Sequence, residues 1–151
     1  MSLSTTIAAA MLVAAAGAPW LQDDGRRYGP LQRRMLSVIA PRLDPDGAEE
    51  LEGEPLSVFS VDLDGDGSRD YVAQLTNDDA FCTHEGCLTF VLRGQKRGFE
   101  VVGQFYAWKV RLGDRPRGSK YRELWVRGAG DQVRRYIWRA RKYQRALSRT
   151  R

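Results

Sequence analysis

Four aspartates with regular spacing are the residues of this sequence with the most defined chemistry. They lie in the stretch 61–71, VDLDGDGSRDY, and form the pattern D-x-D-x-D-G-x-x-D over residues 62–70. Carboxylates on alternate residues can point to one centre when the chain curls, and Gly65 and Gly67 permit the tight backbone of such a curl. Four carboxylates this close together repel one another unless a cation lies between them. Hard oxygen ligands in that number suit Ca²⁺ better than a transition metal, so the stretch predicts a calcium loop.

The loop differs from an EF-hand and resembles another class of calcium loop. An EF-hand loop has an apolar residue at its eighth position and an acid at its twelfth, where this sequence has Arg69 and Ala73. The stretch 58–76 instead resembles the calcium loop of integrin-type FG-GAP and VCBS repeats, in which the loop joins two strands. That resemblance implies four carboxylate ligands and one backbone carbonyl, from Asp62, Asp64, Asp66, Asp70 and Ser68 respectively. One full copy is present, which excludes the complete propeller of those families, and an Asp/Gly-rich turn without an ion is the alternative.

The two cysteines of the chain, Cys82 and Cys87, lie in the stretch FCTHEGCL. An even number of cysteines in an exported protein predicts a disulfide. The residues between them, which include Gly86, suit a bond across the neck of a hairpin loop. A metal site that uses both cysteines and His84 is the alternative, and it needs a fourth ligand because zinc sites in proteins usually have four. The disulfide is therefore the favoured prediction.

The C-terminal part of the chain is basic and aromatic. Residues 94–151 contain 17 Lys and Arg against 4 Asp and Glu, whereas the net charge of the whole chain is +5. Arginines interleaved with tryptophan and tyrosine can contact anionic groups. This pattern predicts a candidate partner-binding surface that consists of Trp125, Arg134, Arg135, Tyr136 and Trp138. The alternative is that the aromatic residues fill the core of a sheet while the arginines cover its solvent face.

The expected partner is a protein or an anionic component of the cell envelope, and export disfavours a nucleic acid. The run 121–143 also resembles a hairpin found in small exported bacterial proteins of unassigned role. That resemblance implies no activity.

The first residues have the features of a secretory signal peptide. Ile7–Ala16 is an apolar run of ten residues, too short for a membrane-spanning helix, which needs about 20. Small residues follow it, and two A-x-A sites predict cleavage after Ala16 or Ala18. Residues 1–18 are therefore expected to be a signal peptide, and the mature protein is expected to be periplasmic or secreted rather than membrane-spanning. A buried N-terminal helix is the alternative.

The rest of the sequence predicts a flexible lead-in at 19–29 and a single α+β domain at 30–151. An apolar stripe at helical spacing predicts an amphipathic helix from Pro30 to Pro41, and the acidic residues 43–55 are expected to form a loop. Short runs rich in β-branched and aromatic residues then alternate with turn formers. They predict strands at 56–61, 71–76, 88–93, 99–105, 108–112, 121–127, 133–138 and 143–147. The expected fold is one N-terminal amphipathic helix packed on a largely antiparallel β-meander sheet.

These features together predict a non-enzymatic exported binding module with a structural calcium loop and one disulfide. With 42% hydrophobic and 28% charged residues, the composition is that of a globular protein rather than a disordered one. The first alternative is an inhibitor or immunity protein directed against a toxic enzyme that acts in the cell envelope. The second is a calcium-dependent hydrolase, which requires a catalytic acid or base beside the ion that the sequence does not identify.

Overall fold

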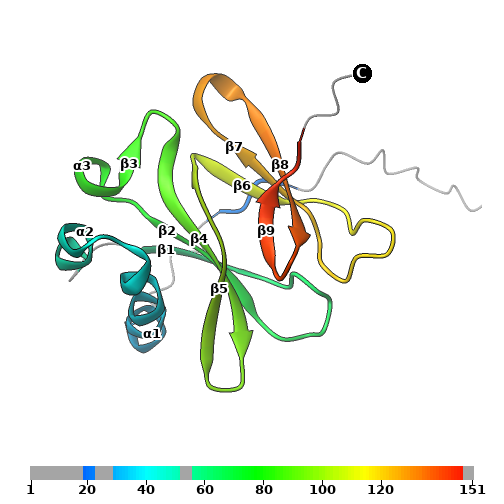
Figure 1. Ribbon diagram of the computed structural model, residues 1–151, viewed down its shortest axis with the longest axis horizontal. Helices are drawn as coiled ribbons and strands as arrows, with labels where there is room; N and C mark the ends of the chain where they lie inside the picture. Colours follow the sequence, from blue (N-terminus) through cyan, green and yellow to red (C-terminus); the bar gives the residue numbers. More distant parts are fainter. Residues whose placement is uncertain (1–18, 23–28, 52–55, 148–151) are drawn as a thin grey trace, which may run out of the picture.

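The computed structural model describes residues 19–22, 29–51 and 56–147 of the chain. The predicted signal peptide, residues 1–18, lies outside the described residues, as do residues 23–28 of the predicted lead-in. The described residues form an α+β fold whose strands pair antiparallel in two sheets (Figure 1). Helices cover one face of the first sheet, and the second sheet packs against its other face.

The first sheet contains five strands, and β4 lies at its centre. β4 pairs with β2 and β3 and also with β5, while β1 pairs with β2 at the edge. The strands are β1 (Leu56–Val61), β2 (Asp70–Leu75), β3 (Cys82–Thr83), β4 (Gly86–Gln95) and β5 (Gly98–Ala107). Because β1 and β2 pair from Leu56 with Leu75 to Val61 with Asp70, the aspartate stretch forms the loop between these two strands.

The second sheet contains four strands in chain order, joined by short connections except between β6 and β7. They are β6 (Lys109–Leu112), β7 (Leu124–Arg127), β8 (Val133–Arg139) and β9 (Lys142–Arg145). The single meander sheet expected from the sequence is therefore wrong, although the strands lie close to their predicted positions. The chain changes sheets at Trp108, whose backbone N–H donates a hydrogen bond of 2.8 Å to the carbonyl of Arg127. This bond aligns β6 with β7 rather than with the first sheet.

The helical segments α1, η1 and α2 precede all the strands in the chain, and two short helical turns lie between strands. The predicted amphipathic helix is α1 (Gly29–Ile39), and the chain continues through Pro41 as the 3-10 turn η1 (Ala40–Arg42). The prediction of a loop at 43–55 is partly wrong, because residues Pro45–Glu50 form the helix α2. The Asp44 carboxylate caps α2 by accepting a hydrogen bond of 2.7 Å from the Gly47 N–H. The two short turns are α3 (Asp78–Phe81) and η2 (Ala129–Asp131).

The first sheet is buried on both faces, and its residues alternate between two hydrophobic clusters. On β2, Tyr71 and Ala73 pack in the cluster that contains Met35 of α1. Val72, which lies between them, packs in the cluster that contains Leu124 of the second sheet. This alternation follows from the two-residue period of a strand. Leu63 of the β1–β2 loop also packs in the cluster that contains Leu124, so the loop lies beside the interface of the two sheets.

Candidate metal centre

Short hydrogen bonds from the backbone to carboxylates hold the β1–β2 loop in a curl. The Asp62 carboxylate accepts a hydrogen bond of 2.8 Å from the Gly65 N–H and one of 3.2 Å from the Gly67 N–H. Gly65 and Gly67 have φ values of 72° and 81°, in the left-handed region that glycine adopts at little cost. The glycines expected to permit the curl therefore do so.

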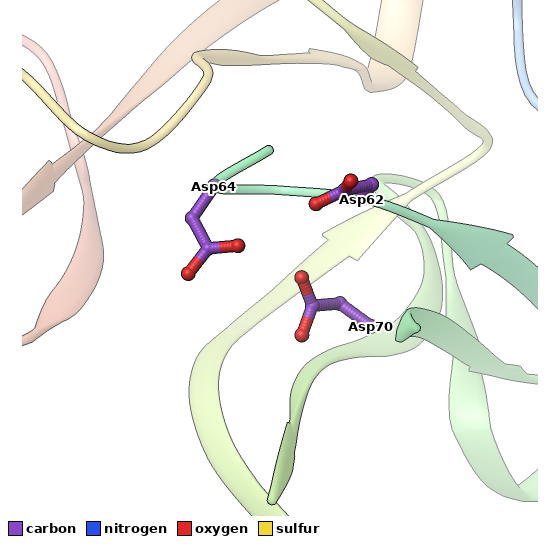
Figure 2. Close-up of side chains that lie close together, drawn as sticks. All are labelled: Asp62, Asp64 and Asp70. Atoms are coloured by element: carbon purple, nitrogen blue, oxygen red, sulfur yellow. The ribbon is translucent and has the colours of Figure 1, made fainter. Parts of the chain in front are cut away.

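Three of the four predicted carboxylate ligands lie together in this loop. One carboxylate oxygen each from Asp62, Asp64 and Asp70 lies within 4.8 Å of the other two, and the three side chains face a common space (Figure 2). Carboxylate oxygens at this separation could hold a metal ion between them. Among the described residues, these three form the one group of Asp, Glu, Cys or His side chains that lie close enough together to hold a metal ion.

The fourth predicted carboxylate ligand, Asp66, lies outside this cluster. The carboxylate of Asp66 accepts a hydrogen bond of 2.7 Å from the backbone N–H of Ser68, and both residues are exposed. The N–H of Asp66 itself donates to the Asp64 carboxylate at 3.2 Å. The structure thus brings together Asp62, Asp64 and Asp70 and leaves Asp66 and Ser68 at the outer side of the loop.

Asp70 is the most buried of the clustered carboxylates, with 2% of its surface exposed. Burial raises the pKa of this carboxyl group above its ordinary value, and the negative charges of Asp64 and Asp66 raise it further. Hydrogen bonds from the N–H groups of Leu63 and Gly94, both 2.9 Å long, act in the opposite direction and lower the pKa. The net rise means that the ionised form of Asp70 is disfavoured where it lies. A cation in the cluster would favour the ionised form.

Two basic residues from the long β6–β7 connection lie against the loop, and sequence reasoning missed both. Lys120 Nζ lies 3.2 Å from Asp64 Oδ2, and this contact raises the pKa of the Lys120 amine. The guanidinium of Arg115 covers Gly65 so closely that a Cβ there would lie 2.4 Å from its Nη2 atom. Both residues stand about 50 positions from the loop in the sequence, so no local pattern could have identified them.

The loop also connects the two sheets through its backbone and through Leu63. The Leu63 side chain is fully buried in the cluster between the sheets, together with Val110 and Val126. Its carbonyl accepts a hydrogen bond of 2.8 Å from the Arg122 N–H, just before β7. Any ion that fixes this loop would therefore fix a contact between the sheets.

The predicted disulfide between Cys82 and Cys87 is present. The two residues are directly opposite each other in the antiparallel pair of β3 and β4, at the neck of a hairpin as expected. Because both sulfur atoms are bonded to each other, the alternative metal site with His84 is excluded. The His84 side chain is 83% exposed and lies 3.4 Å from Glu85.

The five residues of the predicted partner-binding surface do not share one face. Tyr136 and Trp138 pack inward, with ring centres 4.7 Å from Phe105 and 3.8 Å from Tyr121 respectively. Trp125 alternates along β7 with the buried residues Leu124 and Val126, so its side chain lies on the outer face of the sheet. Arg135 is directly opposite Trp125 on β8 and lies on the same face. Arg134 is 17% exposed and forms an ion pair of 3.1 Å with Glu85. The aromatic residues at 136 and 138 thus belong to the sheet core, as the alternative interpretation expected.

Comparison with known proteins finds no match to this chain among protein families, curated proteins or solved structures. Among the described residues, no helix has the length and apolar character needed to cross a membrane. Among the described residues, the three clustered aspartates have the most defined arrangement for chemistry.

Proposed function

We propose that the β1–β2 loop binds one Ca²⁺ and that this ion serves a structural role in a non-enzymatic, exported binding module. The observation that carries the proposal is the cluster of Asp62, Asp64 and Asp70, whose carboxylate oxygens lie within 4.8 Å of one another. These side chains supply oxygen ligands alone, which suit Ca²⁺. The spacing of the four aspartates in the sequence predicts the same ion. In this proposal Asp66 and Ser68 are further ligands from the exposed side.

The position of the loop supports a structural role for this ion. Asp64 and Asp70 are buried, and Leu63 between the first two ligands is enclosed by residues of both sheets. An ion that neutralises these carboxylates would reduce their repulsion and stabilise the curl that carries Leu63 into the interface. The ion would thus act on the packing of the sheets.

Export is supported by two features of the chain. The disulfide between Cys82 and Cys87 is of a kind that persists in oxidising compartments outside the cytoplasm. The apolar run Ile7–Ala16 and the small residues that follow it have the composition of a signal peptide. Both features agree with a periplasmic or secreted protein.

Calorimetric titration of chelator-treated protein with Ca²⁺ tests the proposal. We expect one Ca²⁺ per chain for the wild-type protein. Asp64→Asn removes one ligand charge and should weaken binding by about tenfold or more, since charged ligands set calcium affinity. Asp79→Asn removes an exposed acid on α3 and should leave the affinity unchanged. Absence of binding to the wild-type protein, or equal binding to the Asp64→Asn variant, would contradict the proposal.

A further inference from the structure

A cleft between β5 and β9 lies apart from the aspartate cluster and is built from other residues. Its volume is about 440 Å³, within the range of cavities that hold small ligands. Val101–Gln104 of β5 form one wall, and Lys142–Arg145 of β9 form the other. The two strands are in contact and lie beside each other where the sheets meet (Figure 1). Arg42, at the end of η1, completes the cleft.

The charged side chains of this cleft are all cationic. Arg42, Lys142 and Arg145 come from three separate places, namely η1, the start of β9 and its end, and all three are exposed. The described residues that line the cleft include no aspartate or glutamate. Neutral hydrogen-bonding groups accompany the cations, from the amides of Gln104 and Gln144.

In two other cavities of the described structure, arginines that line the cavity have carboxylate partners, unlike the cations of this cleft. Arg145 also lines the cavity of about 410 Å³ beside Trp125, where Arg134 and Arg135 already pair with Glu85 and Glu123. In the cavity of about 560 Å³ beside Trp108, Arg127 already pairs with Asp131. Among the described residues, none forms an ion pair with the three cations of the β5–β9 cleft. Their charge is therefore available to a ligand.

We propose that the β5–β9 cleft binds a phosphate-bearing ligand. Two arginine guanidinium groups offer planar forks of N–H donors that match phosphate oxygens in pairs. A phosphate monoester or diphosphate carries a charge of about −2 or more at neutral pH, which matches three cations better than a single carboxylate does. The phosphate can belong to a free small molecule or to a lipid headgroup. This site uses none of the proposed calcium ligands. Phosphate binding can therefore be tested independently of calcium binding.

Binding is tested with two probes in a low-salt buffer that contains a calcium chelator, so that the result does not depend on the aspartate loop. Inorganic pyrophosphate represents the free ligand, and vesicles that contain phosphatidic acid represent the lipid-borne phosphate. We expect the wild-type protein to bind at least one probe. Arg42→Gln and Arg145→Gln should each weaken that binding by about tenfold, as the loss of one charge-assisted contact does.

Arg97→Gln is the matched control, because it removes the same charge from the exposed β4–β5 turn outside the cleft. It should change the affinity by less than about twofold, the effect of a distant screened charge. Binding of pyrophosphate identifies a free phosphate ligand, whereas binding to vesicles alone identifies a headgroup. If neither probe binds, or if Arg97→Gln weakens binding as much as Arg42→Gln, the cleft is not a phosphate site.

Discussion

Lys120 is the residue through which the β6–β7 connection contacts the aspartate cluster. Its amine lies 3.2 Å from Asp64 Oδ2, and its side chain is 64% exposed. An ammonium group at this position offsets the negative charge of the cluster and competes with a metal ion for the Asp64 carboxylate. A metal ion at the cluster would therefore either displace the Lys120 amine from Asp64 or bind beside it.

Substitution of Lys120 should strengthen calcium binding. In the Lys120→Met variant the competing charge is removed, and the calcium affinity should rise by about twofold to fivefold, the modest factor that an exposed ion pair represents. Calorimetric titration measures this change. Lys96→Met, which removes an exposed charge from the β4–β5 turn, should leave the affinity as it is. Weaker binding to the Lys120→Met variant would show that Lys120 supports the ion rather than competes with it.

Among the residues of the site, the sequence pattern identified those that are close together in the chain. Asp62, Asp64 and Asp70 were predictable because the spacing of carboxylates and glycines within one loop is a local feature. Lys120 and Arg115 were not, because their contact with the loop depends on how the second sheet docks. The spacing also could not show that the Asp66 carboxylate accepts a hydrogen bond from the Ser68 N–H within the loop instead of joining the cluster.

The β3–β4 hairpin is the element whose stability depends most on a covalent bond. Its disulfide joins residues five positions apart, and β3 contains two residues. The hairpin also contacts the second sheet, because Glu85 pairs with Arg134 and Trp108 Nε1 donates a hydrogen bond to the His84 carbonyl at 3.2 Å. We therefore expect the disulfide to stabilise this short strand, which has few ladder bonds.

Removal of the disulfide should destabilise the domain without unfolding it. The loop that the disulfide closes is short, so the double variant Cys82→Ser/Cys87→Ser should lose about 2 kcal/mol of unfolding free energy, as chain entropy predicts. Denaturant unfolding of the oxidised wild-type protein and of the double variant measures the difference. Reduction of the wild-type protein should produce a similar loss. Equal stability of all three forms would show that the hairpin contacts alone fix this element.

The elements themselves were largely predictable, whereas their division into two sheets was not. The strand patterns are local and follow the two-residue period. The passage from β5 to β6 has no such signal, because Ala107, Trp108 and Lys109 continue the run without a glycine or proline. The acidic residues 45–50 were expected to form a loop because of their proline and glycine. Pro45 instead occupies the first turn of α2, where it is tolerated.

At the scale of the whole molecule, separate polar contacts join the two sheets around their shared hydrophobic cluster. Lys120 and Asp64 pair at the aspartate loop, and Glu85 and Arg134 pair at the disulfide hairpin. Between them, the Arg122 N–H donates a hydrogen bond of 2.8 Å to the Leu63 carbonyl of the aspartate loop, and the Arg122 carbonyl accepts one of 2.9 Å from the Tyr143 hydroxyl of β9. The aspartate loop is the contact that the proposed calcium ion would strengthen. Calcium should therefore change the stability of the entire domain.

Thermal unfolding with and without Ca²⁺ tests this account most directly. A ligand that binds the folded state alone stabilises it by about 2.7 kcal/mol at a hundredfold excess over its Kd. For a domain of this size, that corresponds to a rise in Tm of about 5–10 °C. The wild-type protein and the Asp79→Asn variant should show this rise between chelator and Ca²⁺, and the Asp64→Asn variant should lose about half of it or more, because its weaker binding lowers the excess of Ca²⁺ over Kd. Mg²⁺ should produce a smaller rise because it gives up its water reluctantly. An identical Tm for the wild-type protein in chelator and in millimolar Ca²⁺ would show that the loop is a turn without an ion.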